Sequence, residues 1–347
     1  MHNPIATAAA GLQPPLGSNV IRTLDMHTGG EPLRIVVEGL PQLRGRTVLE
    51  KRAWFSTHLD HIRTALMWEP RGHADMYGAV VSASETEPGA WDVFFLHNEG
   101  YSTMCGHAIL ALTRWIVESG TVSSGQDTVL FHVPAGRIEA RATWRDGVVA
   151  HSAFRNVPSF VLHRDAQVEV PGLGVVRLDV AYGGAFYALV DAAPLGLSLA
   201  AGNAGAVIDA GRRIKHAVMG SLPVQHPAEP ALSFLYGTIF TSPAHTPGRH
   251  SRNVCIFADG EVDRSATGSG VSARIALHVA RGDVALGQTI EIESITGSTM
   301  QVTAIVQTRF GPHEAVIPEV SGSAHYTGRH EFWIDPTDPM RDGFLVR

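Results

Sequence analysis

The sequence contains little cysteine, little charge and no long apolar run. Among its 347 residues are two cysteines, Cys105 and Cys255, which give neither a disulfide framework nor the ligand spacing of a zinc site. We therefore expect a reducing, cytoplasmic setting. The chain has 27 Lys and Arg against 33 Asp and Glu, a formal charge of −6, which argues against nucleic acid or an anionic membrane as a partner. None of its apolar runs is long enough to span a bilayer.

Apolar residues make up 44% of the chain, which allows a sizeable core, and its length favours two domains. Strand-like apolar runs separated by turn residues are frequent. Helix-like runs are fewer and lie at residues 51–66, 105–119, 203–219 and 267–281. This mixture predicts an α+β fold. Residues 1–19 are expected to form a disordered or frayed tail.

Two segments of the chain, residues 77–120 and 236–282, resemble each other. Each contains an apolar strand, a turn-rich stretch, a second short strand, a loop and a helix-like run. A glycine lies 15 positions after Cys105 and another 15 positions after Thr267, where glycine commonly ends a helix. The repeat predicts two matched domains facing one cleft, with a boundary near residues 170–185 and the two helix starts opposite each other. Chance similarity between two short apolar patterns is the alternative.

Cys105 opens the first of the two repeated helices. Unpaired backbone N–H groups and the helix dipole favour an anion there, so we expect them to lower the thiol pKa from its usual value of about 8.5. A thiolate at this position is a competent base or nucleophile. Gly106 would let a substrate approach the backbone, and His107 could bind a carboxylate or stabilise the thiolate. The alternative is a buried, inert cysteine, which is what we expect of Cys255 in its apolar strand-like run.

Thr267 opens the second repeated helix, and a threonine hydroxyl almost never takes a proton from carbon. The backbone amides of Gly268 and Ser269, with the nearby hydroxyls, suit a substrate carboxylate. Ordinary helix capping by Ser and Thr is the alternative. Asp263 could hold a substrate ammonium, or it could be a loop aspartate that binds backbone N–H groups. The 18 histidines form no recognisable metal-binding motif, so no metal is expected.

Four segments together resemble the proline racemase family of the diaminopimelate epimerase-like superfamily, and the similarity runs from about Ile21 to the C-terminus. The resemblance implies two similar α/β domains, each a β-barrel-like sheet around a central helix, with the active site in the cleft between them. It implies no metal or organic cofactor. Two of the four segments, 25–32 and 70–76, have no role that can be derived from their residues. The matching segments are residues 25–32 (DMHTGGEP), 70–76 (PRGHADM), 104–107 (MCGH) and 263–270 (DRSATGSG).

The resemblance also implies where the two domains lie in the chain and which residues form the active site. Racemases and hydroxyproline 2-epimerases of the family carry cysteine at both helix starts, whereas threonine at the second start resembles the trans-3-hydroxy-L-proline dehydratase branch. Ala266 replaces the proline that is usual there. The expected domains are residues 20–180, which carry Cys105 and are completed by 335–347, and residues 181–334, which carry Asp263 and Thr267. The resemblance implies that Cys105 is catalytic, that Thr267 lines the opposite face, and that substrate is bound by Gly106, His107, Asp263, Gly268 and Ser269.

With a base on one face only, two-base racemisation is disfavoured, while an elimination needs only one face. This agrees with what the resemblance implies, namely a dehydratase that acts on a small-molecule substrate, removes the α-proton with Cys105 and gives Δ1-pyrroline-2-carboxylate through its Δ2 tautomer. The alternatives are a proline racemase or 4-hydroxyproline 2-epimerase, a catalytically idle imino-acid binding protein, and a metal-dependent hydrolase, whose ligand spacing is absent. A homodimer is expected only because two-fold dimers are common.

Overall fold

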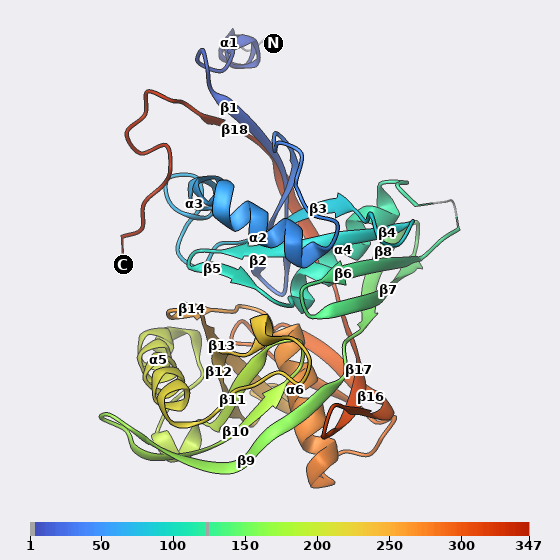
Figure 1. Ribbon diagram of the computed structural model, residues 1–347, viewed down its shortest axis with the longest axis vertical. Coiled ribbons are helices and arrows are strands. Elements are labelled where there is room, and N and C mark those ends of the chain that lie inside the picture. Colours follow the sequence, from blue (N-terminus) through green and yellow to red (C-terminus); the bar gives the residue numbers. More distant parts are fainter. Residues whose placement is uncertain (1–3, 123–124, 347) are drawn as a thin grey trace.

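The computed structural model describes residues 4–122 and 125–346, which form two lobes stacked along the long axis of the molecule (Figure 1). The run at 51–66, expected as one helix, is divided at Leu59 into two helices. A short exposed helix lies within the expected tail. The helices are α1 (Pro4–Gly11), α2 (Val48–His58), α3 (Asp60–Met67), α4 (Gly106–Glu118), α5 (Ala204–Ser221) and α6 (Gly268–Arg281), with short 3-10 turns η1 (Ala193–Leu195), η2 (Ala201–Asn203) and η3 (Pro230–Leu232).

Strands supply most of the remaining structure and follow one another along the chain. The earlier strands are β1 (Asn19–Thr28), β2 (Glu31–Glu38), β3 (Tyr77–Ala83), β4 (Ala90–His97), β5 (Gly100–Ser102), β6 (Thr128–Val133), β7 (Gly136–Arg145), β8 (Val148–Arg155) and β9 (Ser159–Val170). The later strands are β10 (Gly174–Tyr182), β11 (Phe186–Asp191), β12 (Leu235–Ser242), β13 (Ser251–Phe257), β14 (Glu261–Val262), β15 (Thr289–Glu293), β16 (Thr299–Phe310), β17 (His313–Gly322) and β18 (Ala324–Ile334).

The two halves pair their strands in the same order, which confirms the internal repeat. In the first half β2 runs parallel to β3, β3 is antiparallel to β4, β4 forms a hairpin with β5, and β4 runs parallel to β6. In the second half β11, β12, β13, β14 and β15 repeat these relations one for one. A three-stranded antiparallel ribbon then follows in both halves, β6 to β8 and β15 to β17.

The pairing of β18 brings the end of the chain back to its beginning. β18 is antiparallel to β1, and β9 is antiparallel to β10 in the matching place of the second lobe. The predicted domains, residues 20–180 completed by 335–347 and residues 181–334, therefore need two corrections. β9 and β10 belong to the second lobe rather than the first, and β18 belongs to the first lobe rather than the second (Figure 1). We infer lobes of residues 19–155 with 324–346, and of residues 159–322.

One buried helix lies at the centre of each lobe, as the resemblance implied. α4 contacts β1, β2, β6, β7, β8 and β18, and α6 contacts β9, β10, β11, β16 and β17. Residues 106–113 of α4 and 268–277 of α6 are buried on all sides, which suits helices enclosed by sheet. The two helices begin next to each other between the lobes. Within the described residues, no helix has the length and apolar character needed to cross a membrane.

Candidate active site

The starts of α4 and α6 meet at a small cavity between the lobes. All the site residues predicted from the sequence line it: Cys105, Gly106, His107, Asp263, Thr267, Gly268 and Ser269. The other lining residues were not predicted from the sequence; they are Glu31, Tyr77, Met104, Tyr187, Tyr236, Cys255 and Phe257. Tertiary structure thus joins two segments about 160 positions apart into one site, as the repeat predicted.

Cys105 and His107 form a hydrogen-bonded pair at the start of α4. The Cys105 Sγ lies 3.0 Å from Nδ1 of His107, and Nε2 of His107 lies 3.2 Å from the carbonyl oxygen of Pro32. Because a carbonyl can only accept, Nε2 carries the hydrogen and donates it to Pro32. Nδ1 is then left as an acceptor for the thiol S–H. The ring of Tyr77 packs edge-on against the imidazole, with ring centroids 4.9 Å apart.

The pKa of Cys105 moves in the direction opposite to the one expected. Burial raises the pKa of this thiol well above its usual value, and the nearby carboxyls of Asp263 and Glu31 add to the increase. The hydrogen bond from the Ala108 N–H, which is the effect of the helix start, lowers the pKa but is outweighed. The prediction of a lowered thiol pKa was therefore wrong. Burial also lowers the pKa of His107 to about 3, so the imidazole is neutral at pH 7.

Thr267 precedes α6 in a strained conformation, with φ of +66°. Its side chain makes no capping hydrogen bond, and its backbone N–H donates to Oγ of Ser265 at 3.1 Å. The hydroxyl of Ser269 is 2.7 Å from the hydroxyl of Tyr187. Neither hydroxyl therefore does the capping that was the alternative explanation of this segment.

Asp263 binds a backbone N–H of its own loop and also lines the cavity. Its Oδ1 accepts a hydrogen bond of 2.7 Å from the Ser265 N–H, as a loop aspartate would, while the side chain also lines the cavity. Burial raises its pKa to about 6. At neutral pH this carboxyl is mostly ionised inside a largely enclosed site.

Glu31 is the principal site residue that was not predicted from the sequence. It begins β2, is fully buried, and its Oε2 accepts a 2.7 Å hydrogen bond from the Arg264 N–H of the other lobe. Its Oε1 is buried without a hydrogen-bond partner among the described residues. Burial raises the pKa of Glu31 well above its usual value. The segment 25–32 matched the family, but nothing in its own residue pattern showed that this glutamate would face Asp263.

Three side chains in the cavity stand close enough together to hold a small cation. Among the described residues, Glu31, His107 and Asp263 alone bring three ligand atoms within 4.8 Å of one another. Two carboxylates and one imidazole are a ligand set that divalent metals such as zinc also use. The sequence could not reveal this group, because its members come from three separate segments rather than from one motif.

The family follows from comparison with known proteins. The family model described as proline racemase matches residues 23–345. The chain belongs to the proline racemase family. It is 51% identical over 329 residues to the trans-3-hydroxy-L-proline dehydratase of Colwellia psychrerythraea, with 94% of this chain and 93% of that protein covered. It is 47% identical over 341 residues to the human trans-3-hydroxy-L-proline dehydratase, with 95% and 96% covered.

Solved structures show the same fold for this proline racemase family member. The hydroxyproline epimerase of Agrobacterium vitis, crystallised with trans-4-hydroxy-L-proline, is 31% identical, has a TM-score of 0.88, and is matched over 94% of this chain and 95% of that one. A proline racemase homologue from Agrobacterium radiobacter with bound carbonate is 32% identical and also has a TM-score of 0.88. The predicted α+β fold and family are therefore confirmed.

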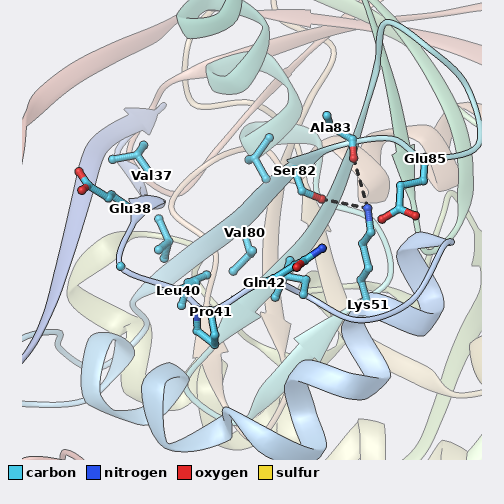
Figure 2. Close-up of a pocket in the computed structure, with 14 residues that line it drawn as sticks. Val37, Glu38, Leu40, Pro41, Gln42, Lys51, Val80, Ser82, Ala83 and Glu85 are labelled. Atoms are coloured by element: carbon cyan, nitrogen blue, oxygen red, sulfur yellow. Dashed lines mark hydrogen bonds between the residues drawn. The ribbon is translucent and has the colours of Figure 1, made fainter.

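A larger hollow of about 930 Å³ lies on the outside of the first lobe of this family member, where β2, β3 and the loop after β2 meet (Figure 2). Lys51 is the buried cation at its edge. The Lys51 ammonium donates to the Ser82 hydroxyl and to the Ala83 carbonyl, and it lies 2.7 Å from Asp92. Its hydrogen-bonding capacity is thus used within the protein.

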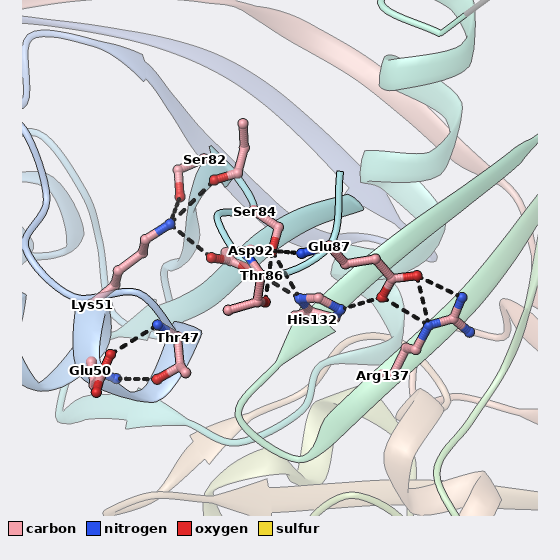
Figure 3. A network of polar contacts seen from close by, with 11 residues as sticks. Thr47, Glu50, Lys51, Ser82, Ser84, Thr86, Glu87, Asp92, His132 and Arg137 are labelled. Carbon is pink, nitrogen blue, oxygen red and sulfur yellow. Dashed lines mark hydrogen bonds and ion pairs between the residues drawn. The ribbon is translucent and has the colours of Figure 1, made fainter. Parts of the chain in front are cut away.

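The same lysine begins a chain of polar contacts on the first lobe (Figure 3). Asp92 Oδ1 lies 3.2 Å from Nδ1 of His132, whose Nε2 lies 2.8 Å from Glu87, and Glu87 pairs with Arg137 at 3.1 Å. The bonds from Arg137 and His132 lower the pKa of Glu87 to about 2. This chain connects α2 with β4, β6 and β7, and we interpret it as structural.

Proposed function

We propose that the protein is a trans-3-hydroxy-L-proline dehydratase that uses Cys105 as its one carbon-directed base. The observation that carries the proposal is the asymmetry of the shared cavity: a thiol stands at the start of α4, and Thr267 stands at the matching start of α6. The similarity to proteins named trans-3-hydroxy-L-proline dehydratase over nearly the whole chain supports it. A threonine hydroxyl cannot serve as the second base that a two-base racemase needs.

Binding of the substrate follows from the two helix starts. The carboxylate lies against the backbone N–H groups at the starts of α4 and α6, where Gly106, Gly268 and Ser269 leave the backbone accessible. These N–H groups also stabilise the charge that develops at C2. The ring nitrogen binds Asp263, and His107 holds the thiol in place through the 3.0 Å contact. Thr267 fills the opposite face without exchanging a proton.

The chemistry needs one group on one face of the ring. In trans-3-hydroxy-L-proline the C3 hydroxyl and the C2 hydrogen lie on the same face. Burial and, less strongly, the nearby carboxyls raise the pKa of the Cys105 thiol. The substrate ammonium offsets the carboxyls and so favours the thiolate. The thiolate removes the C2 proton, the C2=C3 bond forms as the C3–O bond breaks, and the thiol returns the proton to the departing hydroxide. Water and Δ2-pyrroline-2-carboxylate leave a regenerated thiolate, and the product tautomerises to Δ1-pyrroline-2-carboxylate.

The test is a substrate panel of proline and its 3- and 4-hydroxy isomers in deuterated water, read for pyrroline formation and for chirality. We expect pyrroline from trans-3-hydroxy-L-proline and no racemisation of proline. Inversion at C2 without loss of water would instead establish a racemase or epimerase, and binding without any turnover would establish an imino-acid binding protein.

The role of Cys105 is tested with the two cysteines as a matched pair. Cys105→Ser should lower turnover of trans-3-hydroxy-L-proline by about 100-fold or more, since a serine hydroxyl is a far weaker acid than a thiol. Cys255→Ser makes the same one-atom change at the other buried thiol, which lines the cavity but does not stand at a helix start, and it should cost far less activity. Near-normal turnover by Cys105→Ser contradicts the mechanism.

We further propose a cytoplasmic location and a homodimer. The first rests on the scarcity of cysteine and the second on the frequency of two-fold dimers. Cell fractionation and light scattering of the purified protein measure them directly.

A further inference from the structure

We propose that Glu31 shares the ring nitrogen with Asp263, so that the site selects a secondary ammonium carrying two N–H donors. The inference rests on the proposed function and adds Glu31 to it. Each of the two carboxyls would accept one N–H bond from the ring nitrogen.

The spacing of the three polar atoms fits a nitrogen. The ligand atoms of Glu31, His107 and Asp263 all lie within 4.8 Å of one another. When three atoms lie that close together, there is a position no more than about 2.8 Å from each of them. A distance of about 2.8 Å is an ordinary length for an N–H···O hydrogen bond. The nitrogens of His107 are already engaged by Pro32 and Cys105. The two carboxyls are therefore the acceptors that remain for a ligand.

Both carboxyls accept hydrogen bonds from consecutive backbone N–H groups. The Arg264 N–H donates to Oε2 of Glu31 at 2.7 Å, and the Ser265 N–H donates to Oδ1 of Asp263 at 2.7 Å. The Oε1 of Glu31 stays buried without a partner among the described residues. A buried polar atom of this kind is costly unless a ligand satisfies it.

The described side chains that line the cavity also carry no positive charge. No lysine or arginine is found among the described residues that line it. The guanidinium of Arg264 is directed elsewhere, because its Nη1 lies 2.9 Å from the Asp75 carboxylate and 2.9 Å from the Val262 carbonyl oxygen. Burial raises the pKa of both Glu31 and Asp263. A cation between them would remove that penalty, and an imino acid supplies one on its ring nitrogen.

Three ligands of similar ring size differ in the number of N–H donors that they offer to the two carboxyls. L-Proline has two, N-methyl-L-proline has one, and tetrahydrofuran-2-carboxylate has none. Calorimetry on the wild-type protein should rank their affinities in that order. Glu31→Gln should weaken L-proline by about 10-fold or more, because a charge-assisted bond is lost, and should leave tetrahydrofuran-2-carboxylate unchanged. Asp263→Asn should do the same.

Glu261→Gln is the matched control, since Glu261 is equally buried but outside the cavity, against His97. The Glu261→Gln protein should rank its affinities for the three ligands in the same order as the wild-type protein. Equal affinity of the wild-type protein for L-proline and N-methyl-L-proline overturns the proposal even if no variant folds. So does a Glu31→Gln protein that binds L-proline normally but has a reduced kcat, which would place Glu31 at the leaving hydroxyl instead. Failure of the dehydratase proposal appears separately, as absence of pyrroline from trans-3-hydroxy-L-proline with the ligand order intact.

Discussion

Gly106 and Gly268 face each other across the cleft with no room for a side chain on either. A Cβ built on Gly106 would lie 2.5 Å from the Cα of Gly268, and one built on Gly268 would lie 2.6 Å from the Cα of Gly106. The contact joins the starts of the two central helices, and so it fixes the spacing of Cys105 and Thr267 in the lining of the cavity.

Alanine at either glycine should separate the two helix starts. Gly106→Ala and Gly268→Ala should each destabilise the protein by about 1–3 kcal/mol, the usual cost of overpacking, and should reduce turnover because the backbone N–H groups move apart. Thermal unfolding and initial rates measure both effects. Gly205→Ala is the control, since its Cβ would meet no atom within 4 Å and alanine favours the helix. Wild-type stability in both cleft variants would contradict the close packing.

A second thiol should restore chemistry on the opposite face. Thr267→Cys places an acidic S–H where the repeat mirrors Cys105, so exchange of the proline α-proton and racemisation should rise above the wild-type background. Polarimetry and deuterium incorporation in deuterated water detect them. Thr267→Ser keeps a hydroxyl and should racemise no faster than wild type. If Thr267→Cys folds and still exchanges no α-proton, the one-base explanation of the dehydratase is weakened.

The activity should fall on the acid side with the protonation of Asp263. Its pKa is raised to about 6 by burial. Below that pH the carboxyl becomes neutral and binds an ammonium less strongly, so kcat/KM should decline as the pH falls through about 6, mainly through a higher KM. Rates measured from pH 5 to pH 8 show the decline. If kcat/KM of an Asp263→Asn protein declined in the same way at low pH, the decline would have to come from another group.

The Asp263 carboxyl should lower the stability of the folded protein in the pH range in which it is ionised. The folded-state pKa of Asp263 is raised above the unfolded value of about 3.9, so folding is penalised progressively as the pH rises from about 4 to about 6 and fully above that. Asp263→Asn should therefore have a higher Tm than wild type at pH 7 and a similar Tm near pH 4. A lower Tm for Asp263→Asn at pH 7 would contradict the buried, uncompensated charge.

Zinc should act as an inhibitor rather than as a cofactor. A divalent ion that displaces the Cys105 thiol from His107 can be held by Glu31, His107 and Asp263, at the place that we assign to the ring ammonium. Dialysis against EDTA should leave turnover unchanged, whereas added Zn²⁺ should inhibit competitively with the substrate. Steady-state rates with and without each reagent distinguish the two. Activity that EDTA abolishes and Zn²⁺ restores would assign the three residues to a resident metal.

The helices that build the site could be read from the sequence because their signals are local. Cys105 and Thr267 each stand before a glycine and an apolar run, and α4 and α6 begin directly after them. The division of the run at 51–66 at Leu59 was missed, because one helix and two consecutive helices share the same apolar spacing. The return of β18 to β1 was placed too late, since strand pairing depends on a partner about 300 positions away.

The sequence by itself determined the repeat, the family and the asymmetry between Cys105 and Thr267, because these depend on residue identity and local order. Tertiary structure decided the properties that depend on what surrounds a group. It brought Glu31 to Asp263, and it buried Cys105 deeply enough to reverse the expected direction of its pKa shift. A helix start acts over one turn and can be recognised in a sequence, whereas desolvation is the sum of contacts from both lobes and exists only once the chain has folded.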